Sequence, residues 1–266
     1  MRLNVLTAGD GRPLLLLHGF TGTARTWSAC VDAWAGSHRV IAPDLLGHGG
    51  SDAPAEAAAY ALERQAEGLR DLLLLLDAVP AAVLAYSMGA RLALVLALRY
   101  PELVERLVLE SPSAGIADAA ERAARRAADD GLADDIERDG VAAFIDRWEA
   151  LPLFASQSQL SAAARRAQRQ ERLRHSASGL AGSLRGGGQG AMAPLHDRLG
   201  QVSIPTFVVA GALDSVALER AGAVAGAIPG ARLEVVEGAG HTPHLERPDE
   251  FIRLANEALE TTRTAA

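Results

Sequence analysis

Short aliphatic runs alternate with longer helical patterns along most of this 266-residue chain, and the alternation restricts the folds it can adopt. The expected strands are 14–17, 39–42, 82–85, 107–109, 206–209 and 233–236, and the clearest helical patterns are 62–76, 90–100 and 218–227. Such an order is typical of an α/β fold, in which helices cover both faces of a mostly parallel sheet. A ligand site is then expected at the carboxyl ends of the strands.

One long segment interrupts the alternation. Between about Ser113 and Leu199 the chain shows only helical patterns, rich in Ala, Arg, Glu and Asp. Residues 112–200 contain 12 arginines and 12 acidic residues, so the rest of the chain carries the whole net charge of −7. We therefore predict a core formed by residues 1–112 and 200–266, with residues 113–199 as a helical cap over the ligand site. Additional solvated helices without a role are the alternative.

Composition excludes several classes of function. The net charge of −7 offers no basic surface to a nucleic acid, so none is expected as a partner. All 26 basic residues are arginine, which excludes Schiff-base chemistry and a P-loop lysine. The single cysteine, Cys30, cannot form an internal disulfide, and neither a signal peptide nor a membrane-spanning run is apparent. We expect a cytoplasmic protein without membrane contacts, and its oligomeric state stays open.

The pentapeptide from Ala85 to Gly89 lies between an expected strand and an expected helix. A serine in such a sharp turn, here Ser87, is held outward at the end of the sheet, and small neighbours let the chain double back. The Met88 amide and the helix N-terminus then point to the same place, where negative charge can be stabilised. The usual pattern has glycine in the first position, and Ala85 is the smallest departure from it.

A reactive serine needs a base, and the base needs a carboxylate that orients it. In this architecture the three follow the chain order Ser, then Asp or Glu, then His. Asp214 comes after the expected strand 206–209, and His241 comes after the expected strand 233–236. All three residues are therefore expected at the same edge of the sheet, and we predict a catalytic triad of Ser87, Asp214 and His241.

The loop after the first expected strand reads His18-Gly19-Phe20. In this architecture the loop supplies a second oxyanion donor, which we predict to be the backbone N–H of Phe20 beside that of Met88. His18 is expected to hold this loop rather than to act as a second base. In the turn-rich loop 43–51, Asp44 and His48 are interpreted as structural partners beside the site.

Together these motifs resemble the α/β-hydrolase superfamily across essentially the whole chain. Within it, several segments resemble the 2-succinyl-6-hydroxy-2,4-cyclohexadiene-1-carboxylate (SHCHC) synthases of menaquinone biosynthesis. These segments are 86–91, 110–116 followed by Arg122 and Arg125, 148–154, 179–186 and 197–199. The resemblance implies a central sheet flanked by helices, with a helical cap inserted after the sixth strand.

The same resemblance implies a lyase on a hydrolase scaffold. The family substrate is 2-succinyl-5-enolpyruvyl-6-hydroxy-3-cyclohexene-1-carboxylate, from which pyruvate is eliminated after proton abstraction. Such an elimination needs a base and a site for the developing enolate oxygen, and no acyl-enzyme. Ser87, polarised by His241 and Asp214, is expected to be that base or to relay the proton. The sequence shows no metal-ligand cluster and no cofactor fingerprint, so neither a metal nor a cofactor is expected.

A substrate with several carboxylates needs cationic side chains, and the arginine fork matches a carboxylate. By motif, the resemblance assigns substrate contacts to Tyr86, Arg91, Arg125, Trp148 and Arg172, with Arg174 as the alternative to Arg172. Arg91 lies one helical turn after Ser87, so it can point towards the site. A surface ion pair for each arginine, and a core position for the tryptophan, are the alternatives.

The chain departs from the family pattern in three places. It has residues 187–190 in place of Met-Gly-Thr-Gly, His196 in place of a tryptophan, and Val216-Ala217 in place of a Lys-aromatic pair. The expected triad is unaffected, but the substrate stays open. A serine hydrolase of a carboxylester or a carbon–carbon bond remains an alternative, because the same machinery serves both reactions. A non-catalytic receptor is the second alternative, and the intact triad argues against it.

Overall fold

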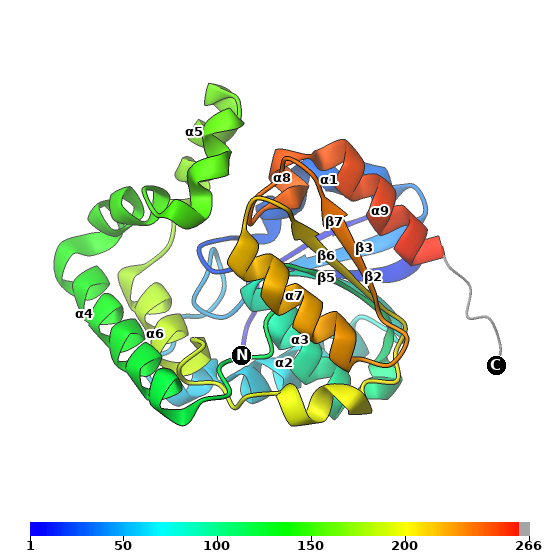
Figure 1. Cartoon of the computed structure of the whole chain (residues 1–266), viewed down its shortest axis with the longest axis horizontal. Helices are drawn as coiled ribbons and strands as arrows, with labels where there is room; N and C mark the ends of the chain where they lie inside the picture. Colours follow the sequence, from blue (N-terminus) through cyan, green and yellow to red (C-terminus); the bar gives the residue numbers. More distant parts are fainter. Residues whose placement is uncertain (261–266) are drawn as a thin grey trace.

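A mostly parallel sheet organises residues 1–260, which are the residues that the computed structural model describes (Figure 1). Its strands are β1 (Val5–Ala8), β2 (Arg12–Leu17), β3 (His38–Pro43), β4 (Ala81–Tyr86), β5 (Val104–Glu110), β6 (Thr206–Gly211) and β7 (Arg232–Val236). They lie in the order β1-β3-β2-β4-β5-β6-β7, with β1 antiparallel to β3 and the other neighbours parallel. The predicted α/β fold is confirmed. Residues 261–266, the end of the predicted core, lie outside the described residues.

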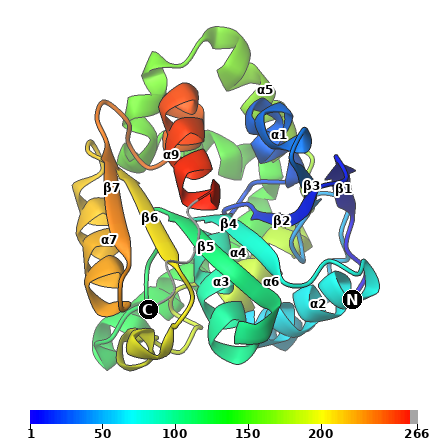
Figure 2. The ribbon, with the colours of Figure 1, turned by 90° about the vertical axis from the view of Figure 1, so that its right-hand side faces the viewer.

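Helices cover both faces of the sheet (Figure 2). On one face pack α2 (Leu62–Leu75), α3 (Met88–Arg99) and α7 (Ser215–Ala227), and on the other α1 (Ser28–Ala35) and α9 (Pro248–Glu260). Side chains alternate along a strand, so Leu15 and Leu17 join the first core whereas Leu14 and Leu16 join the second. A strand buried on both faces is aliphatic throughout, which explains why these strands stand out in the sequence.

Two features of the sheet differ from the expectation. The strand β1 does not stand out in the sequence, because at the edge of the sheet its side chains are only partly buried and form no aliphatic run. The helical insertion follows β5, the fifth strand of the described chain, and not a sixth strand as the resemblance implies. The prediction is wrong by one strand because residues 1–4 add no further strand before β1.

The segment between β5 and β6 is helical. It contains α4 (Ala119–Glu149), η4 (Pro152–Gln159), α5 (Ala162–Arg172), α6 (Ala177–Gly187) and η5 (His196–Gln201). The helices α4 and α6 share a small core of their own, built around Ile136, Phe144 and Leu180, while α5 projects from the body of the molecule (Figure 1). Shorter helical turns elsewhere are η1 (Ala24–Trp27), η2 (Ala57–Tyr60), η3 (Pro101–Leu103) and α8 (Pro243–Glu246). None of the helices described is long and apolar enough to cross a membrane.

The backbone of helix α6 packs directly against the body of the protein at two glycines. A Cβ on Gly179 would lie 2.3 Å from the carbonyl oxygen of Gly47, and one on Gly182 would lie 2.4 Å from the ring of Tyr60. The backbone of α6 can approach this closely only because these side chains are absent. The close contact fixes α6, and with it α4, above the carboxyl ends of the strands.

A second close contact fixes the turn between β4 and α3. A Cβ on Gly89 would lie 2.5 Å from the carbonyl oxygen of Leu17 and 2.6 Å from that of His18. Both neighbours are backbone atoms at the end of β2, so neither can shift without distorting the sheet. The first turn of α3 therefore rests on the start of the 18–20 loop.

Replacing Gly89 by alanine should destabilise the protein by about 1–3 kcal/mol, because the methyl group overpacks a site bounded by backbone. Gly131→Ala is the matched control, since Gly131 lies inside α4 with no atom within 4 Å of its ideal Cβ. In a helix interior alanine should stabilise by about 0.5–1 kcal/mol. Urea unfolding measures both, and equal stability of the two variants would contradict the proposed close contact.

Candidate active site

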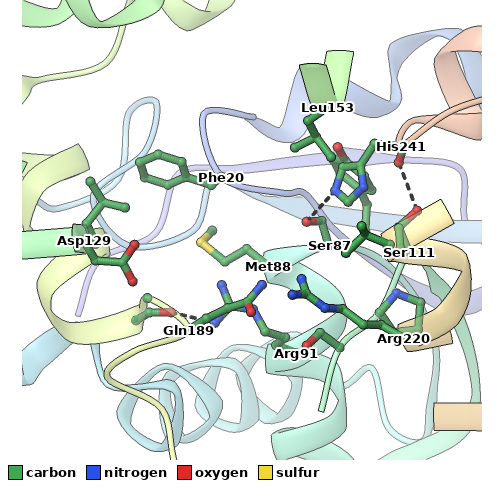
Figure 3. A pocket seen from close by; sticks show the side chains of 18 of the residues that line it. Phe20, Ser87, Met88, Arg91, Ser111, Asp129, Leu153, Gln189, Arg220 and His241 are labelled. Carbon is green, nitrogen blue, oxygen red and sulfur yellow. Dashed lines mark hydrogen bonds between the residues drawn. The ribbon is translucent and has the colours of Figure 1, made fainter. Parts of the chain in front are cut away.

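Three polar side chains from separate loops meet at the carboxyl edge of the sheet. Ser87 lies between β4 and α3, Asp214 follows β6, and His241 follows β7. The Ser87 hydroxyl donates a hydrogen bond to Nε2 of His241 at 3.1 Å (Figure 3). The Nδ1–H of His241 donates to Oδ2 of Asp214 at 2.8 Å. The structure thus brings all three predicted residues within hydrogen-bond distance, in the order that general-base chemistry requires.

The backbone at Ser87 is strained and firmly anchored. Ser87 has a φ of 50° and a ψ of −106°, a conformation that non-glycine residues rarely adopt. Its N–H donates to the carbonyl of Glu110 at 2.9 Å, and its own carbonyl accepts from the N–H of Arg91 at 3.1 Å. These bonds tie the turn to β5 on one side and to α3 on the other, so the hydroxyl is held towards His241.

The loop that carries His241 has its own anchors, which the sequence analysis did not find. The Ser111 hydroxyl donates to the carbonyl oxygen of His241 at 3.0 Å (Figure 3). The carboxylate of Glu246 accepts from the N–H of Gly240 at 2.8 Å and from the hydroxyl of Thr242 at 2.7 Å. Ser111 follows directly after β5, and that position was the signal available in the sequence.

The carboxyl group of Asp214 is held in its ionised form. Burial alone would raise its pKa, but hydrogen bonds from His241 and from the N–H of Ala217 outweigh that effect. The charge of Arg220 acts in the same direction, and the net result is a pKa below the ordinary value for aspartate. An ionised Asp214 keeps Nδ1 of His241 protonated, which leaves Nε2 free to accept the serine proton.

The two predicted oxyanion donors are free. Within residues 1–260, neither the N–H of Phe20 nor that of Met88 donates to another protein group. Met88 is the first residue of α3, so its amide also benefits from the positive end of the helix dipole. His18 shapes the loop that carries Phe20: its Nδ1–H donates to the carbonyl of Gly19 at 2.8 Å, and its Nε2 accepts from the N–H of Leu45 at 2.9 Å.

A cavity of about 210 Å³ opens in front of Ser87, between the sheet and the helical segment (Figure 3). Its wall includes four of the predicted substrate-contact residues, namely Tyr86, Arg91, Arg125 and Trp148.

Arg91 is 7% exposed and donates to the carbonyl of Gly187 at 2.9 Å, with no carboxylate as partner. Burial, and then the nearby charge of Arg125, lower the pKa of Arg91 to about 10. Arg125 instead pairs with Asp129, with Nε and Oδ1 2.7 Å apart.

Two more atoms of the wall are buried without a hydrogen-bond partner. They are Nε1 of Trp148, a donor, and Oε1 of Gln189, an acceptor. Unpaired buried polar atoms cost free energy, roughly 1–3 kcal/mol each, unless a ligand or water satisfies them. With the free charge of Arg91, they indicate that the cavity is built for a polar, anionic molecule. Tyr86 contributes mainly its ring, which stands edge-on to His241 with 5.5 Å between centroids.

The structure does not bring Arg172 to the cavity wall. Its guanidinium pairs with Glu149 at 3.1 Å and lies 5.1 Å from the centre of the Phe154 ring, and that ring forms part of the wall. Arg172 therefore lies behind Phe154 rather than beside Ser87. Arg174, the alternative, is exposed and pairs with Glu171. The expected substrate contact of Arg172 is therefore not seen, because this last residue of α5 pairs with an acid of α4, and Arg174, which follows the end of α5, pairs with an acid of α5.

Residues 12–248 match a family described as the alpha/beta hydrolase fold. The chain belongs to the α/β-hydrolase family. It is 39% identical to a putative 2-succinyl-6-hydroxy-2,4-cyclohexadiene-1-carboxylate synthase from Bacillus subtilis (strain 168), over 92% of this chain and 89% of the relative. The resemblance stated from the sequence is confirmed by this similarity.

Two solved structures resemble this α/β-hydrolase closely. The structure of MenH from S. aureus superposes with a TM-score of 0.92 at 31% identity, covering 97% of both chains. A thermophilic esterase from Thermogutta terrifontis, with malate bound, has a TM-score of 0.86 at 28% identity and covers 97% of this chain and 92% of its own. The two share this scaffold, so the scaffold alone does not decide between elimination and hydrolysis.

A buried cluster of histidines supports the oxyanion loop from behind. The rings of His18 and His48 lie 5.1 Å apart and those of His48 and His175 5.2 Å apart, between centroids. His175, from the helical segment, donates to the carbonyl of Thr21 and accepts from the N–H of Gly49. In the part of the chain that the structure describes, no group of His, Cys, Asp or Glu side chains has the arrangement of a metal site.

The three histidines should stay neutral in the native protein well below their ordinary pKa. Burial lowers the pKa of His18 to about 4 and lowers those of His48 and His175 as well. In the unfolded chain the imidazoles take up protons below about pH 6.5, whereas in the native protein His18 does so only near pH 4, and His48 and His175 at a lower pH than when unfolded. The free energy of unfolding should therefore decrease as the pH is lowered from 6.5 to 4, by about 3 kcal/mol for His18 alone. Histidine ring signals in NMR test this, and native protonation of His18 near pH 6.5 would contradict it.

Proposed function

We propose that this α/β-hydrolase is a lyase that eliminates pyruvate from 2-succinyl-5-enolpyruvyl-6-hydroxy-3-cyclohexene-1-carboxylate and gives SHCHC, a step of menaquinone biosynthesis. The observation that carries the proposal is a Ser–His–Asp arrangement facing a cavity in which Arg91 has no carboxylate partner. The similarity to the Bacillus subtilis relative and to MenH from S. aureus supports it.

The two ring structures define the bond changes. The substrate has one ring double bond, between C3 and C4, and an enolpyruvyl ether on C5, while the product is a 2,4-diene. A proton must therefore leave C2, next to the succinyl ketone. Its electron pair forms the C2–C3 double bond, the old double bond moves to C4–C5, and the C5–O bond breaks. The departing enolate of pyruvate takes up a proton, so no water is consumed.

The Ser87 oxygen is the group that meets the C2 proton. His241 accepts the serine proton through Nε2, and the ionised carboxylate of Asp214 stabilises the imidazolium that results. Removal of a proton next to a ketone puts negative charge on the ketone oxygen. The free N–H groups of Phe20 and Met88 donate to that oxygen while the charge develops. No acyl-enzyme is needed, because the serine never attacks a carbonyl carbon.

Arginine side chains position the substrate. Arg91 is the buried cation without an acidic partner, and it binds one substrate carboxylate. Arg125 reaches the cavity while paired with Asp129, so it shares its charge between that residue and the substrate. The indole N–H of Trp148 supplies a further hydrogen bond. Tyr86 covers the substrate on the side of His241.

A serine hydrolase is the second candidate function. The superposition with a Thermogutta terrifontis esterase favours it, because that protein shares the scaffold at 28% identity. In that reaction Ser87 attacks a carbonyl carbon, and the same two amides stabilise a tetrahedral oxyanion. The unpaired Arg91 argues against an apolar ester as substrate.

Ser87→Ala should lower the rate of pyruvate release by about 10²–10⁴, because the proton-transfer group is lost while the binding residues remain. The measurement follows pyruvate with a coupled dehydrogenase and subtracts the spontaneous elimination of the substrate. Circular dichroism checks that the variant is folded. No pyruvate release by wild type, together with turnover of a p-nitrophenyl ester, would instead support the hydrolase.

Arg91→Gln should raise KM roughly tenfold or more with a smaller change in kcat, because a charge-assisted hydrogen bond to the substrate is lost. Glutamine keeps polar N–H groups at this position without the charge, and circular dichroism checks that the variant is folded. Arg198→Gln, which removes an exposed arginine outside the cavity wall, should leave both constants unchanged. An unchanged KM in Arg91→Gln would remove Arg91 from the binding site.

A further inference from the structure

The helix α7 brings another cation to the cavity. Arg220 lies on this helix, six residues after Asp214, and its side chain reaches from α7 into the cavity (Figure 3). Val216 and Ala217 of the same helix also line the cavity. Because Arg220 follows Val216 by one helical turn, the two side chains project from the same face of α7. None of the sequence motifs indicates Arg220.

The guanidinium of Arg220 has no partner in the protein. Within residues 1–260 it forms neither a hydrogen bond nor an ion pair. The two acidic side chains of the cavity wall are already engaged, Asp129 by Arg125 and Asp214 by His241. Arg220 is exposed at the cavity wall, so its charge borders the space that a ligand occupies, and among the wall carboxylates only Asp214 lies near enough to interact with that charge, without a hydrogen bond or ion pair.

We infer that Arg220 is a further substrate-binding residue, which takes one carboxylate of the substrate on the α7 side of the cavity. This inference rests on the proposed function for the identity of that substrate. The proposed substrate has three carboxylates, on the ring, on the succinyl arm and on the enolpyruvyl group. Arg91 is free and Arg125 is shared with Asp129, so these two residues leave one carboxylate without a full cationic partner.

The surroundings of Arg220 leave room for a flexible arm. Arg220 and Ser113 also line a smaller neighbouring pocket, of about 90 Å³, to whose wall His196 contributes. Arg220 thus borders both spaces, and its side chain can meet a carboxylate in the main cavity. The carboxylate comes either from the succinyl arm or from the enolpyruvyl group. Binding of succinate, which resembles the first, and of pyruvate, which resembles the second, distinguishes these sources.

A role through Asp214 alone makes a different prediction. The charge of Arg220 favours the ionised form of Asp214, although the hydrogen bonds from His241 and Ala217 contribute more. If Arg220 acted only in this way, its loss would lower kcat and move the acidic limb of the pH–rate profile. A residue that binds a carboxylate changes KM and leaves that limb in place.

The test compares wild type with Arg220→Gln and with Arg12→Gln. Arg12 is an exposed arginine at the opposite, amino end of β2, so its replacement removes the same charge far from the cavity. We expect KM for the proposed substrate to rise roughly tenfold in Arg220→Gln, with kcat within about twofold of wild type. Arg12→Gln should match wild type in both constants.

Calorimetric binding of succinate and of pyruvate gives a readout without turnover. Arg220→Gln should lower the affinity for one of these anions roughly tenfold. The anion whose affinity falls identifies which part of the substrate, the succinyl or the enolpyruvyl group, supplies the carboxylate. An unchanged KM with unchanged binding of both anions would overturn the inference, as would a fall in kcat with a shifted acidic limb at constant KM. If wild type releases no pyruvate but anion binding still depends on Arg220, the proposed function fails and the carboxylate site remains.

Discussion

The contact between the backbone of Gly89 and the end of β2 is the constraint on which the site depends. It presses the first turn of α3 against the carbonyls of Leu17 and His18, where any side chain would collide. The amide of Met88 begins that turn, and the amide of Phe20 belongs to the loop it touches. The same contact therefore sets the spacing of both oxyanion donors and the direction of the Ser87 hydroxyl. The strain at Ser87 persists because hydrogen bonds to Glu110 and Arg91 oppose its release.

The charged side chains of the cavity wall, rather than the Ser–His–Asp arrangement, determine which ligand the site selects. The Ser87, His241 and Asp214 arrangement suits both an elimination and a hydrolysis, since both need a polarised serine and a place for negative charge. What differs is the ligand that the wall selects. Arg91 and Arg220 line the cavity without an ion-paired acid, whereas most arginines of the helical segment are paired with Asp or Glu of the same segment. The unpaired charges favour a substrate with several carboxylates over an apolar ester.

Much of the fold could be predicted because the central strands are buried on both faces and read as aliphatic runs. The positions of Ser87, Asp214 and His241 directly after strands were sufficient to bring them to one edge of the sheet. The edge strand β1 escaped notice because a partly exposed strand of four residues has no such signature.

The directions of the arginine side chains were harder to predict. Arg172 and Arg220 both lie on helices, and helical spacing alone does not say which acidic groups neighbouring helices present. Glu149 pairs with Arg172 behind Phe154, whereas Arg220, which no motif indicated, has no ion-paired acid and lines the cavity. Ser111 and Glu246 were missed for a related reason, because they act on the backbone around His241.

In the proposed reaction Ser87 removes a proton and no water enters. Both elimination and hydrolysis of the enolpyruvyl ether release pyruvate, so the ring product decides between them. The most direct measurement is mass spectrometry of that ring product after turnover in isotopically labelled water. Elimination gives the diene, with no added water. A ring product heavier by one water would contradict the proposed reaction: hydrolysis at the vinyl carbon leaves an unlabelled ring diol and labelled pyruvate, whereas displacement at C5 gives a labelled diol.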